Sequence, residues 1–138
     1  MLTARIIHPP DGFYRGREFL LVSDRFLGGN ILLVGTTTSR DFPVTPDAIQ
    51  TAFRGPEGQG DGDGVLAIVS PDGARLLYAT FLGGSGGDLI RGMALGPKGA
   101  VYLVGSTSSP DFPVTPNAAQ RTLSGKSDAF VVKLIPAR

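Results

Sequence analysis

Aspartates are the side chains of this chain best suited to acid–base chemistry. Two carboxylates placed on either side of a glycosidic bond can hydrolyse it, and six of the ten aspartates are candidates: Asp41, Asp61, Asp63, Asp88, Asp111 and Asp128. The sequence selects no pair among them. The single histidine, His8, precedes two prolines, and no serine or cysteine accompanies it in a recognisable nucleophile setting. A hydrolase is therefore disfavoured, and we expect a protein that is not an enzyme and has no catalytic residue.

Two glycine-rich segments are candidates for ion binding. Between positions 58 and 64, glycines alternate with Gln59, Asp61 and Asp63, and such a flexible backbone can bring several oxygens around a hard cation such as Ca²⁺. A calcium loop also needs a bidentate glutamate after these residues, and the sequence lacks one there. The run Gly83-Gly84-Ser85-Gly86-Gly87 lacks the Lys-Ser/Thr ending of a phosphate-binding loop. We expect neither a metal nor a cofactor at either segment.

A repeated hexapeptide holds the candidate ligand-binding residues. Asp41-Phe42-Pro43-Val44-Thr45-Pro46 returns letter for letter at positions 111 to 116, an offset of 70 residues, and each copy follows a Leu-Val-Gly strand end. The rings of Phe42 and Phe112 could stack on a sugar or an aromatic side chain beside Asp41 and Asp111. Alternatively, each phenylalanine anchors its loop to a sheet, and each aspartate accepts backbone N–H bonds in its own loop. We favour the anchoring role.

The repeat extends beyond the hexapeptide in both directions. Positions 33–37 match 103–107, and 48–50 match 118–120, at the same offset of 70. Positions 63–69 then match 128–134 at an offset of 65, so the first copy carries five extra residues in its glycine-rich loop. Further upstream, Phe26-Leu27-Gly28-Gly29 is similar to Phe81-Leu82-Gly83-Gly84, an alignment in which the first copy lacks one strand. A second alignment makes 20–22 that strand, and we rank it lower.

Composition favours an all-β fold with many tight turns. Twenty glycines and eleven prolines punctuate short apolar runs. Gly28-Gly29-Asn30, Pro71-Asp72-Gly73 and Pro97-Lys98-Gly99 have the residue types of hairpin turns, which predicts an antiparallel meander. Thr45 and Thr115 are predicted N-caps of short helical turns. The expected strands are 4–7, 18–25, 31–37, 65–70, 76–82, 89–95, 101–107 and 129–135.

Charge and hydropathy exclude several classes of partner. Thirteen basic and twelve acidic residues are interspersed, which gives a net charge of +1 and no basic patch for nucleic acid. No segment approaches the roughly 20 consecutive apolar residues of a membrane helix, and no apolar run of signal-peptide length precedes Pro9. We therefore expect no nucleic-acid partner, no membrane insertion and no export signal. The absence of cysteine leaves the compartment open.

The second copy resembles a known repeat family. Tyr78-Ala79-Thr80-Phe81-Leu82-Gly83-Gly84, the hexapeptide with its following Ala-x-Gln, and Asp128-Ala129-Phe130-Val131-Val132-Lys133-Leu134 are similar to the bacterial seven-bladed-type β-propeller repeat. The resemblance implies four-stranded antiparallel blades arranged radially, in proteins that are often secreted or attached to the cell surface. The chain would then be a partial propeller of about two blades. Its segments would be a partial blade at 1–29, a first repeat at 30–84 and a second repeat at 85–138.

These observations predict a structural or protein-interaction scaffold. A lectin-like module that binds a glycan or another ligand through the hexapeptide loops is the alternative. Propellers close with about four blades or more, so the chain is expected to associate with copies of itself or with neighbouring blades of a longer chain. The consecutive apolar residues at 65–69 and 130–132 predict burial on both faces of their strands. We therefore expect a closed oligomer of three or four copies, or aggregation.

Overall fold

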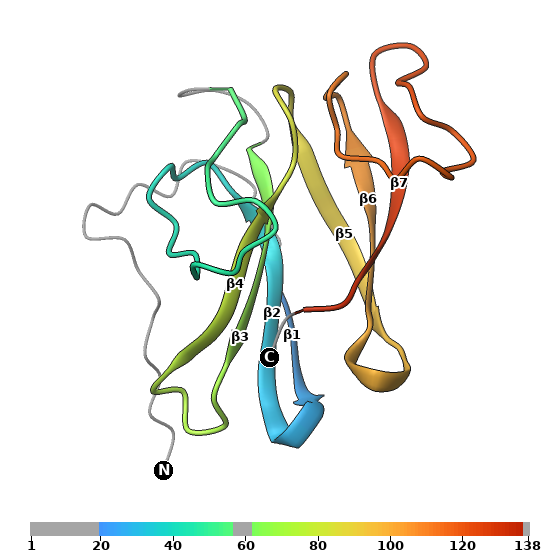
Figure 1. Cartoon of the computed structure of the whole chain (residues 1–138). Helices are drawn as coiled ribbons and strands as arrows, with labels where there is room; N and C mark the ends of the chain where they lie inside the picture. Colours follow the sequence, from blue (N-terminus) through green and yellow to red (C-terminus); the bar gives the residue numbers. More distant parts are fainter. Residues whose placement is uncertain (1–19, 57–61, 137–138) are drawn as a thin grey trace.

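The computed structural model describes residues 20–56 and 62–136, which form two antiparallel sheets (Figure 1). The strands of the first sheet follow one another in chain order, as do those of the second, so each sheet is a meander. The first sheet consists of β1 (Leu20–Phe26), β2 (Asn30–Thr37), β3 (Asp63–Val69) and β4 (Leu76–Leu82). The second consists of β5 (Asp88–Leu95), β6 (Val101–Thr107) and β7 (Asp128–Leu134).

The all-β prediction is confirmed, and seven of the eight expected strands form within two residues of their predicted bounds. The eighth, at 4–7, lies outside the described residues. The predicted turns are also present. Gly73 adopts φ +72° between β3 and β4, and 3-10 turns at Leu27–Gly29 and Pro97–Gly99 close the other two hairpins. Gly28 and Lys98, which stand at equivalent repeat positions, both have positive φ.

Strand register identifies the equivalent strands of the two copies. Leu20 of β1 pairs with Gly35, and Ile90 of β5 pairs with Gly105, the glycine 70 positions later. Strand β1 is thus the counterpart of β5, and our ranking of the two alignments was wrong. The shared sequence Phe-Leu-Gly-Gly does not mark equivalent positions, because it forms a hairpin turn at 26–29 and a strand end at 81–84. Both structures accept an apolar pair followed by two glycines.

The change of offset further along the repeat is confirmed. Asp63 pairs with Thr37 at the start of β3, and Asp128 pairs with Thr107 at the start of β7. The two threonines are 70 positions apart, whereas the two aspartates are 65 apart. The five additional residues fall between β2 and β3, in a connection whose positions 57–61 lie outside the described residues.

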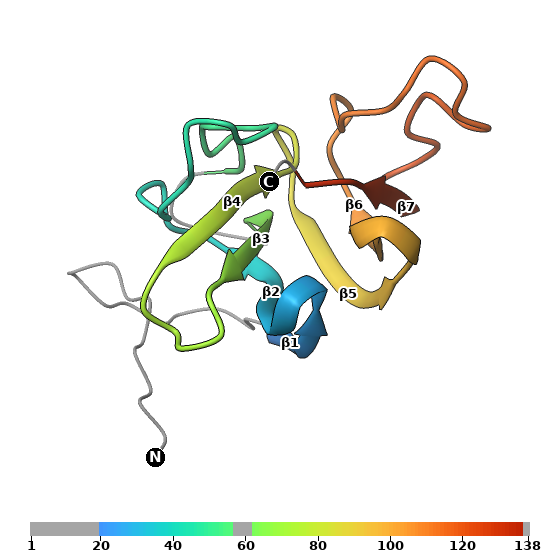
Figure 2. The ribbon, with the colours of Figure 1, turned by 60° about the horizontal axis from the view of Figure 1, so that its bottom comes forward.

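One hydrophobic core lies between the two sheets. Strand β5 packs against β2 and β3, which brings the sheets together along their length (Figure 2). Every residue of β3 is buried, as its run of apolar residues predicts. The first sheet contributes Phe26, Leu32, Val34, Leu66, Ile68, Tyr78 and Leu82 to this core, and the second contributes Ile90, Val101, Leu103, Phe130 and Leu134.

The predicted helical turns after the hexapeptides are absent. Ala48 N–H donates to Thr45 O over 3.0 Å, and Ala118 N–H donates to Thr115 O over 3.0 Å, so each segment makes a single main-chain turn. No helix follows Thr45, whose hydroxyl group bonds to the backbone of Ala79. Within residues 20–56 and 62–136, no helix is long and apolar enough to cross a membrane.

Candidate functional site

The first hexapeptide loop covers the outer edge of β4. Thr45 N–H donates to Ala79 O over 3.1 Å, and Ala79 N–H donates back to Thr45 Oγ1 over 3.1 Å. Phe81 N–H donates to Gln50 O over 3.1 Å. Val44 and Phe42 pack on the same end of the sheet. Strand β4 is therefore held between β3 on one side and the loop on the other.

A glutamine–aspartate contact locks this loop in place. Gln50 Nε2 donates to Asp63 Oδ2 over 3.0 Å and to Ala52 O over 2.9 Å. Arg54 N–H donates to the same Asp63 oxygen over 2.8 Å, and Gln50 Oε1 accepts from Gly83 N–H over 3.0 Å. One side chain thus joins the loop, the start of β3 and the end of β4.

The second loop makes the same lock. Gln120 Nε2 donates to Asp128 Oδ2 over 2.7 Å and to Thr122 O over 2.8 Å, while Ser124 N–H donates to Asp128 Oδ2 over 2.6 Å. These donors and acceptors are the repeat equivalents of those in the first loop. Two copies of one sequence pattern therefore adopt one local conformation.

The second loop differs in what covers it. No strand pairs with the outer edge of β7 within the described ranges 20–56 and 62–136. Val114 is 46% exposed and Thr115 and Gln120 are exposed, whereas their equivalents in the first loop are half-buried or, for Gln50, buried. The edge of β7 and the second loop consequently border an open slot at the place that β4 fills in the first copy.

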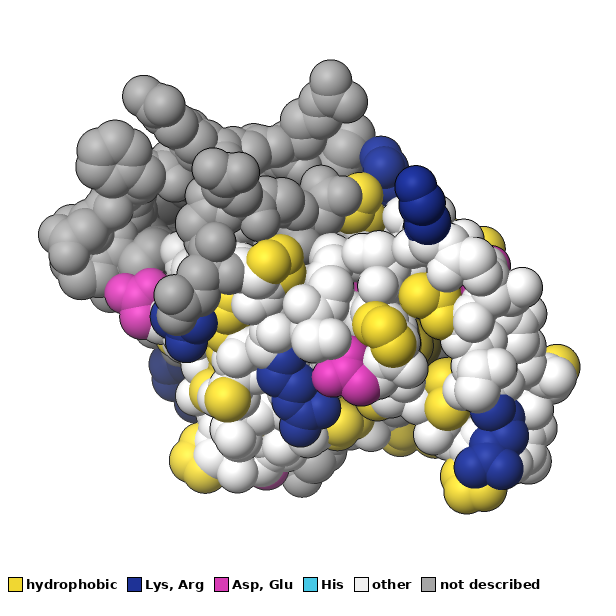
Figure 3. All heavy atoms as spheres, turned by 90° about the horizontal axis from the view of Figure 1, so that it is seen from above, with side chains coloured by type: hydrophobic (Ala, Val, Ile, Leu, Met, Phe, Trp, Pro, Cys, Tyr) yellow, Lys and Arg dark blue, Asp and Glu magenta, His cyan; other side chains and the backbone are white. Residues whose placement is uncertain are grey.

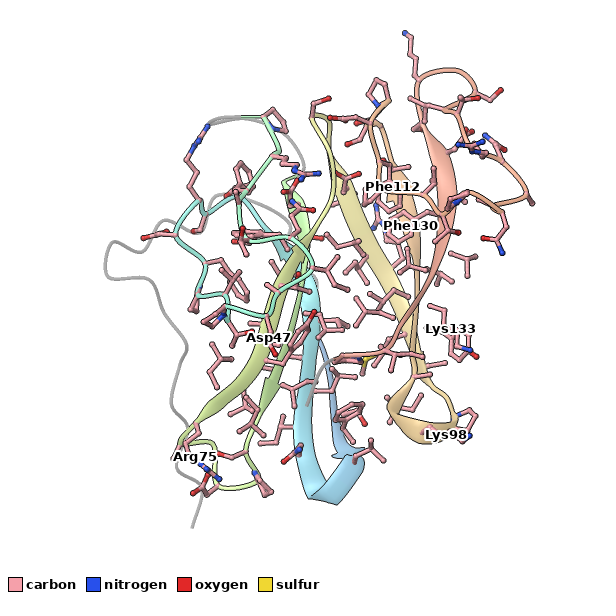
Figure 4. All side chains as sticks on the ribbon, in the orientation of Figure 1. Asp47, Arg75, Lys98, Phe112, Phe130 and Lys133 are labelled. Atoms are coloured by element: carbon pink, nitrogen blue, oxygen red, sulfur yellow. The ribbon has the colours of Figure 1, made fainter. Side chains whose placement is uncertain are left out.

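The far face of the second sheet exposes two valines. Val104 and Val131 pair across β6 and β7 and are 43% and 74% exposed. Their repeat equivalents, Val34 and Leu66, are 0% and 1% exposed because they lie in the core between the sheets. The prediction that 130–132 is buried on both faces is therefore wrong for Val131. Lys133 lies on the same side of β7, away from the first sheet (Figure 4).

Both hexapeptide phenylalanines pack against a sheet. The Phe42 ring meets Phe81 edge-on with centroids 5.8 Å apart, and the Phe112 ring stacks on Phe130 at 4.7 Å (Figure 4). Each ring is half-buried. The contacts match the anchoring role that the sequence favours and leave part of each ring exposed.

The two hexapeptide aspartates differ in their surroundings. Asp111 Oδ1 accepts from Ser85 N–H over 2.7 Å and from Ser85 Oγ over 2.9 Å, and these bonds lower the pKa of Asp111. The expectation that Asp111 bonds within its own loop is therefore wrong, because Ser85 lies in the connection between β4 and β5. Asp41 is exposed.

The glycine-rich connection from 83 to 87 uses its backbone donors internally. Gly84 N–H donates to Asp88 Oδ2, Gly86 N–H to Ser109 Oγ, and Gly87 N–H to Ser108 Oγ, each over 2.9 Å. Ser85 N–H is taken by Asp111, as described above. A phosphate would have to displace four bonds to reach these donors. A strand, β5, follows where a phosphate loop would have a helix.

The order Gly-x-Ser-x-Gly does occur in the chain, at Ser85, contrary to our expectation of no nucleophile setting. In α/β-hydrolases such a serine stands between a strand and a helix, with a histidine beside it. Here β5 follows, and the Ser85 hydroxyl donates to Asp111. The single histidine lies outside the described residues. The surroundings of Ser85 are those of a hydrogen-bonded turn.

The structure brings together one pair of carboxylates that the sequence did not select. Asp63 and Asp88 begin β3 and β5, and both side chains are fully buried. A Cβ atom built on Gly83 would lie 2.6 Å from Asp63 Oδ1 and 2.5 Å from Asp88 Oδ2, so both carboxylates converge on this glycine. Asp88 accepts from Thr107, Ser109 and Gly84. Asp63 Oδ1 has no hydrogen-bond partner among the described residues.

Burial governs the protonation of this pair. Desolvation raises the pKa of Asp63 to about 6, and the Asp88 carboxylate adds to the rise against hydrogen bonds from Arg54 and Gln50. Burial also raises the pKa of Asp88. Because Asp88 has more donors, we assign the charge to Asp88 and the proton to Asp63 below about pH 6. Enclosed within the protein, the pair can hold a proton but offers no access to a sugar.

Metal ligands do not cluster in the part of the chain that the structure describes. Within it, no three His, Asp or Glu side chains lie close enough to hold a metal ion. Asp61, the partner of Asp63 in the cation loop considered from sequence, lies outside the described residues. Asp63 itself belongs to β3 and bonds to Gln50 and Arg54.

Viewed from the loop end, basic and acidic side chains are interspersed on the visible surface (Figure 3).

The chain matches no protein-family model and no curated protein. Its internal repeat is therefore the available comparison. In the first sheet, β4 pairs with the outer edge of β3, and the face around Val34 and Leu66 packs on the second sheet. In the second sheet, the equivalent edge of β7 and the face around Val104 and Val131 are open among the described residues.

Proposed function

We propose that this chain is a β-propeller-type repeat module that acts as a non-enzymatic structural or protein-interaction scaffold. The observation that carries the proposal is the head-to-tail packing of the two sheets. The face of the first sheet around Val34 and Leu66 packs on the second sheet, and the equivalent face of the second sheet around Val104 and Val131 is open. Repeating the same step places another sheet on this open face.

Such packing uses two different surfaces of each unit. Contacts of this kind generate rings when the rotation between units closes, and open fibres when it does not. Exposed valines in the middle of a sheet face lose about 25 cal/mol per Å² of apolar surface left in water. The far face of the second sheet therefore favours a partner, which would be a further sheet from a second copy or from neighbouring repeats.

Val104→Glu is the variant that tests this function. Val104 is 43% exposed at the centre of the far face, so a glutamate there leaves the core between the sheets unchanged and puts a charge into the proposed contact. We expect the wild-type chain to run as a closed oligomer of three or four copies in size-exclusion chromatography with light scattering. The variant should shift to the mass of a monomer.

Ala74→Glu is the matched control, because Ala74 is exposed on the turn between β3 and β4, away from the far face. It should leave the wild-type mass unchanged. A wild-type chain that is a monodisperse monomer with a cooperative melt and no hydrophobic dye binding would overturn the proposed stacking.

Ligand binding through Asp41, Phe42, Asp111 and Phe112 has less support. Asp111 is bonded to Ser85, and both aromatic rings pack against the sheets. A glycan that bound the wild type on an array and lost binding to a Phe112→Ala variant of native stability would favour this alternative.

A further inference from the structure

We propose that the outer edge of β7 and the second hexapeptide loop form an acceptor site for an extended peptide segment with the sequence type of β4. The inference deepens the scaffold function by naming the partner. It concerns the edge of the second sheet, whereas the stacking above concerns its face. The proposal rests on an open strand edge beside a loop whose hexapeptide is identical to that of the loop that binds β4.

The first copy shows how such a strand is held. Strand β4 pairs with β3 along Gly64 to Val69, and its other edge is bonded to Thr45 and Gln50 of the loop. The outer edge of β4 is thus bonded to the loop at Ala79 and Phe81. Strand β7 is the repeat equivalent of β3, and the second loop is the equivalent of the first.

The acceptor is already in its binding conformation. The lock from Gln120 to Asp128 and Thr122 has nearly the same distances as the lock from Gln50 to Asp63 and Ala52, although no strand fills the second slot in the described residues. A preformed site loses little conformational entropy when the strand enters. The outer edge of β7 also presents backbone donors and acceptors that pair with no strand among the described residues, and such an edge is a template for an incoming strand.

The contacts of β4 define the chemistry of the partner. Thr80 Oγ1 accepts from Gln50 N–H over 3.0 Å, and Phe81 is fully buried against Phe42 and Phe53. Gly83 N–H donates to the Gln50 side chain at the strand end. The predicted partner is an uncharged, extended segment with the order Ala-Thr-Phe-x-Gly, in which Gln120 and Phe112 replace Gln50 and Phe42.

The direction of each backbone donor follows from alternation. The N–H groups of Ala79 and Phe81 point to the loop, so that of Thr80 points to β3, and Leu66 opposite it points back to β4. Strand β7 is the equivalent of β3, and Val131 is the equivalent of Leu66. The N–H groups of β7 that point to the open edge are therefore those of Ala129, Val131 and Lys133. Those of the intervening residues point to β6.

A second copy of the chain is a poor donor, because its own β4 is bonded on both edges. Donation would require opening the first sheet. The partner is an extended segment that presents a free strand of this sequence type.

The test is titration of a dye-labelled synthetic peptide with the sequence of residues 74–85 into the full chain, followed by fluorescence anisotropy. We expect saturable binding of one peptide per chain. A peptide with proline in place of Thr80 lacks the central donor to β7 and should bind at least tenfold more weakly. Val131→Pro, which removes the opposite donor on the edge without removing a bond to β6, should weaken the wild-type peptide to the same extent.

Hydrogen exchange supplies the residue-level readout. The amides of Ala129, Val131 and Lys133 should exchange more slowly when the peptide is bound, and those of Phe130 and Val132 should be protected with or without it. The proposal would be overturned if no peptide bound or if the two peptides bound equally well. It would also be overturned if the peptide protected other amides instead, or if the three edge amides were already protected in the free chain. Binding to a monomeric wild-type chain would refute the stacking alone, and an oligomer without peptide binding would refute the acceptor site alone.

Discussion

Gly105→Ala is expected to destabilise the second sheet strongly. A Cβ atom on Gly105 would lie 1.9 Å from Leu89 O and 2.9 Å from Phe130 Cζ. Leu89 O belongs to the backbone of the neighbouring strand β5, so it cannot move aside without breaking the ladder between β5 and β6. Overpacking against backbone costs on the order of 3 kcal/mol or more, a large part of the 5 to 15 kcal/mol that stabilises a typical domain. Urea denaturation followed by circular dichroism measures the loss.

Gly92→Ala is the matched control in the adjacent strand. Its nearest obstacle is Val104 Cγ2 at 3.0 Å, a side-chain methyl group that can rotate away. We expect a change of about 1 kcal/mol or less in the free energy of unfolding. Comparable losses for the two variants would contradict the steric explanation of the Gly105→Ala effect.

Asp63→Asn is expected to stabilise the protein at neutral pH. The pKa of Asp63 rises from 3.8 in the unfolded chain to about 6 in the fold, so the folded state binds the proton more tightly. Stability from this group is fully present below pH 4 and is lost as the pH rises through about 6. Allowing for screening by solvent, we expect a wild-type loss on the order of 1 to 2 kcal/mol between pH 4 and pH 7.

The asparagine stays neutral, so this pH dependence should nearly disappear. Its carbonyl oxygen can accept from Gln50 and Arg54, and its amide can donate toward Asp88 in place of the unpaired Asp63 oxygen. Thermal melts at pH 4, 5, 6 and 7 measure the effect. Asp128→Asn is the control, since Asp128 keeps the equivalent bonds on a half-buried side chain. A lower melting temperature for Asp63→Asn at pH 7, or an unchanged pH profile, would contradict the assignment.

The sequence alone was sufficient to locate the strands and their hairpin turns. Short apolar runs between Gly and Pro residues determine where extended backbone can begin and end, and Gly73 takes the positive φ that its turn requires. The repeat offsets of 70 and 65 also follow from letters alone, and the strand registers confirm them. The helical turns predicted after Thr45 and Thr115 are absent, and each segment makes the same single main-chain turn.

The carboxylate pair depended on tertiary structure. Asp63 and Asp88 begin strands of different sheets, and they meet only because β5 packs against β2 and β3. Their raised pKa values come from burial by the surrounding protein. The bond between Asp111 and Ser85 likewise joins two connections that have no regular spacing in sequence. Sequence periodicity and motif spacing do not predict such contacts, because the residues that meet are distant in the chain.

The two hexapeptides separate these contributions most clearly. Their identical letters determine an identical main-chain turn at Thr45 and Thr115, because that turn depends on local backbone preferences. Their exposure differs because β4 lies under the first loop and no described strand lies under the second. The sequence thus determined the shape of both loops. The neighbouring strand, a property of tertiary structure, decided which loop is a packed edge and which borders an open one.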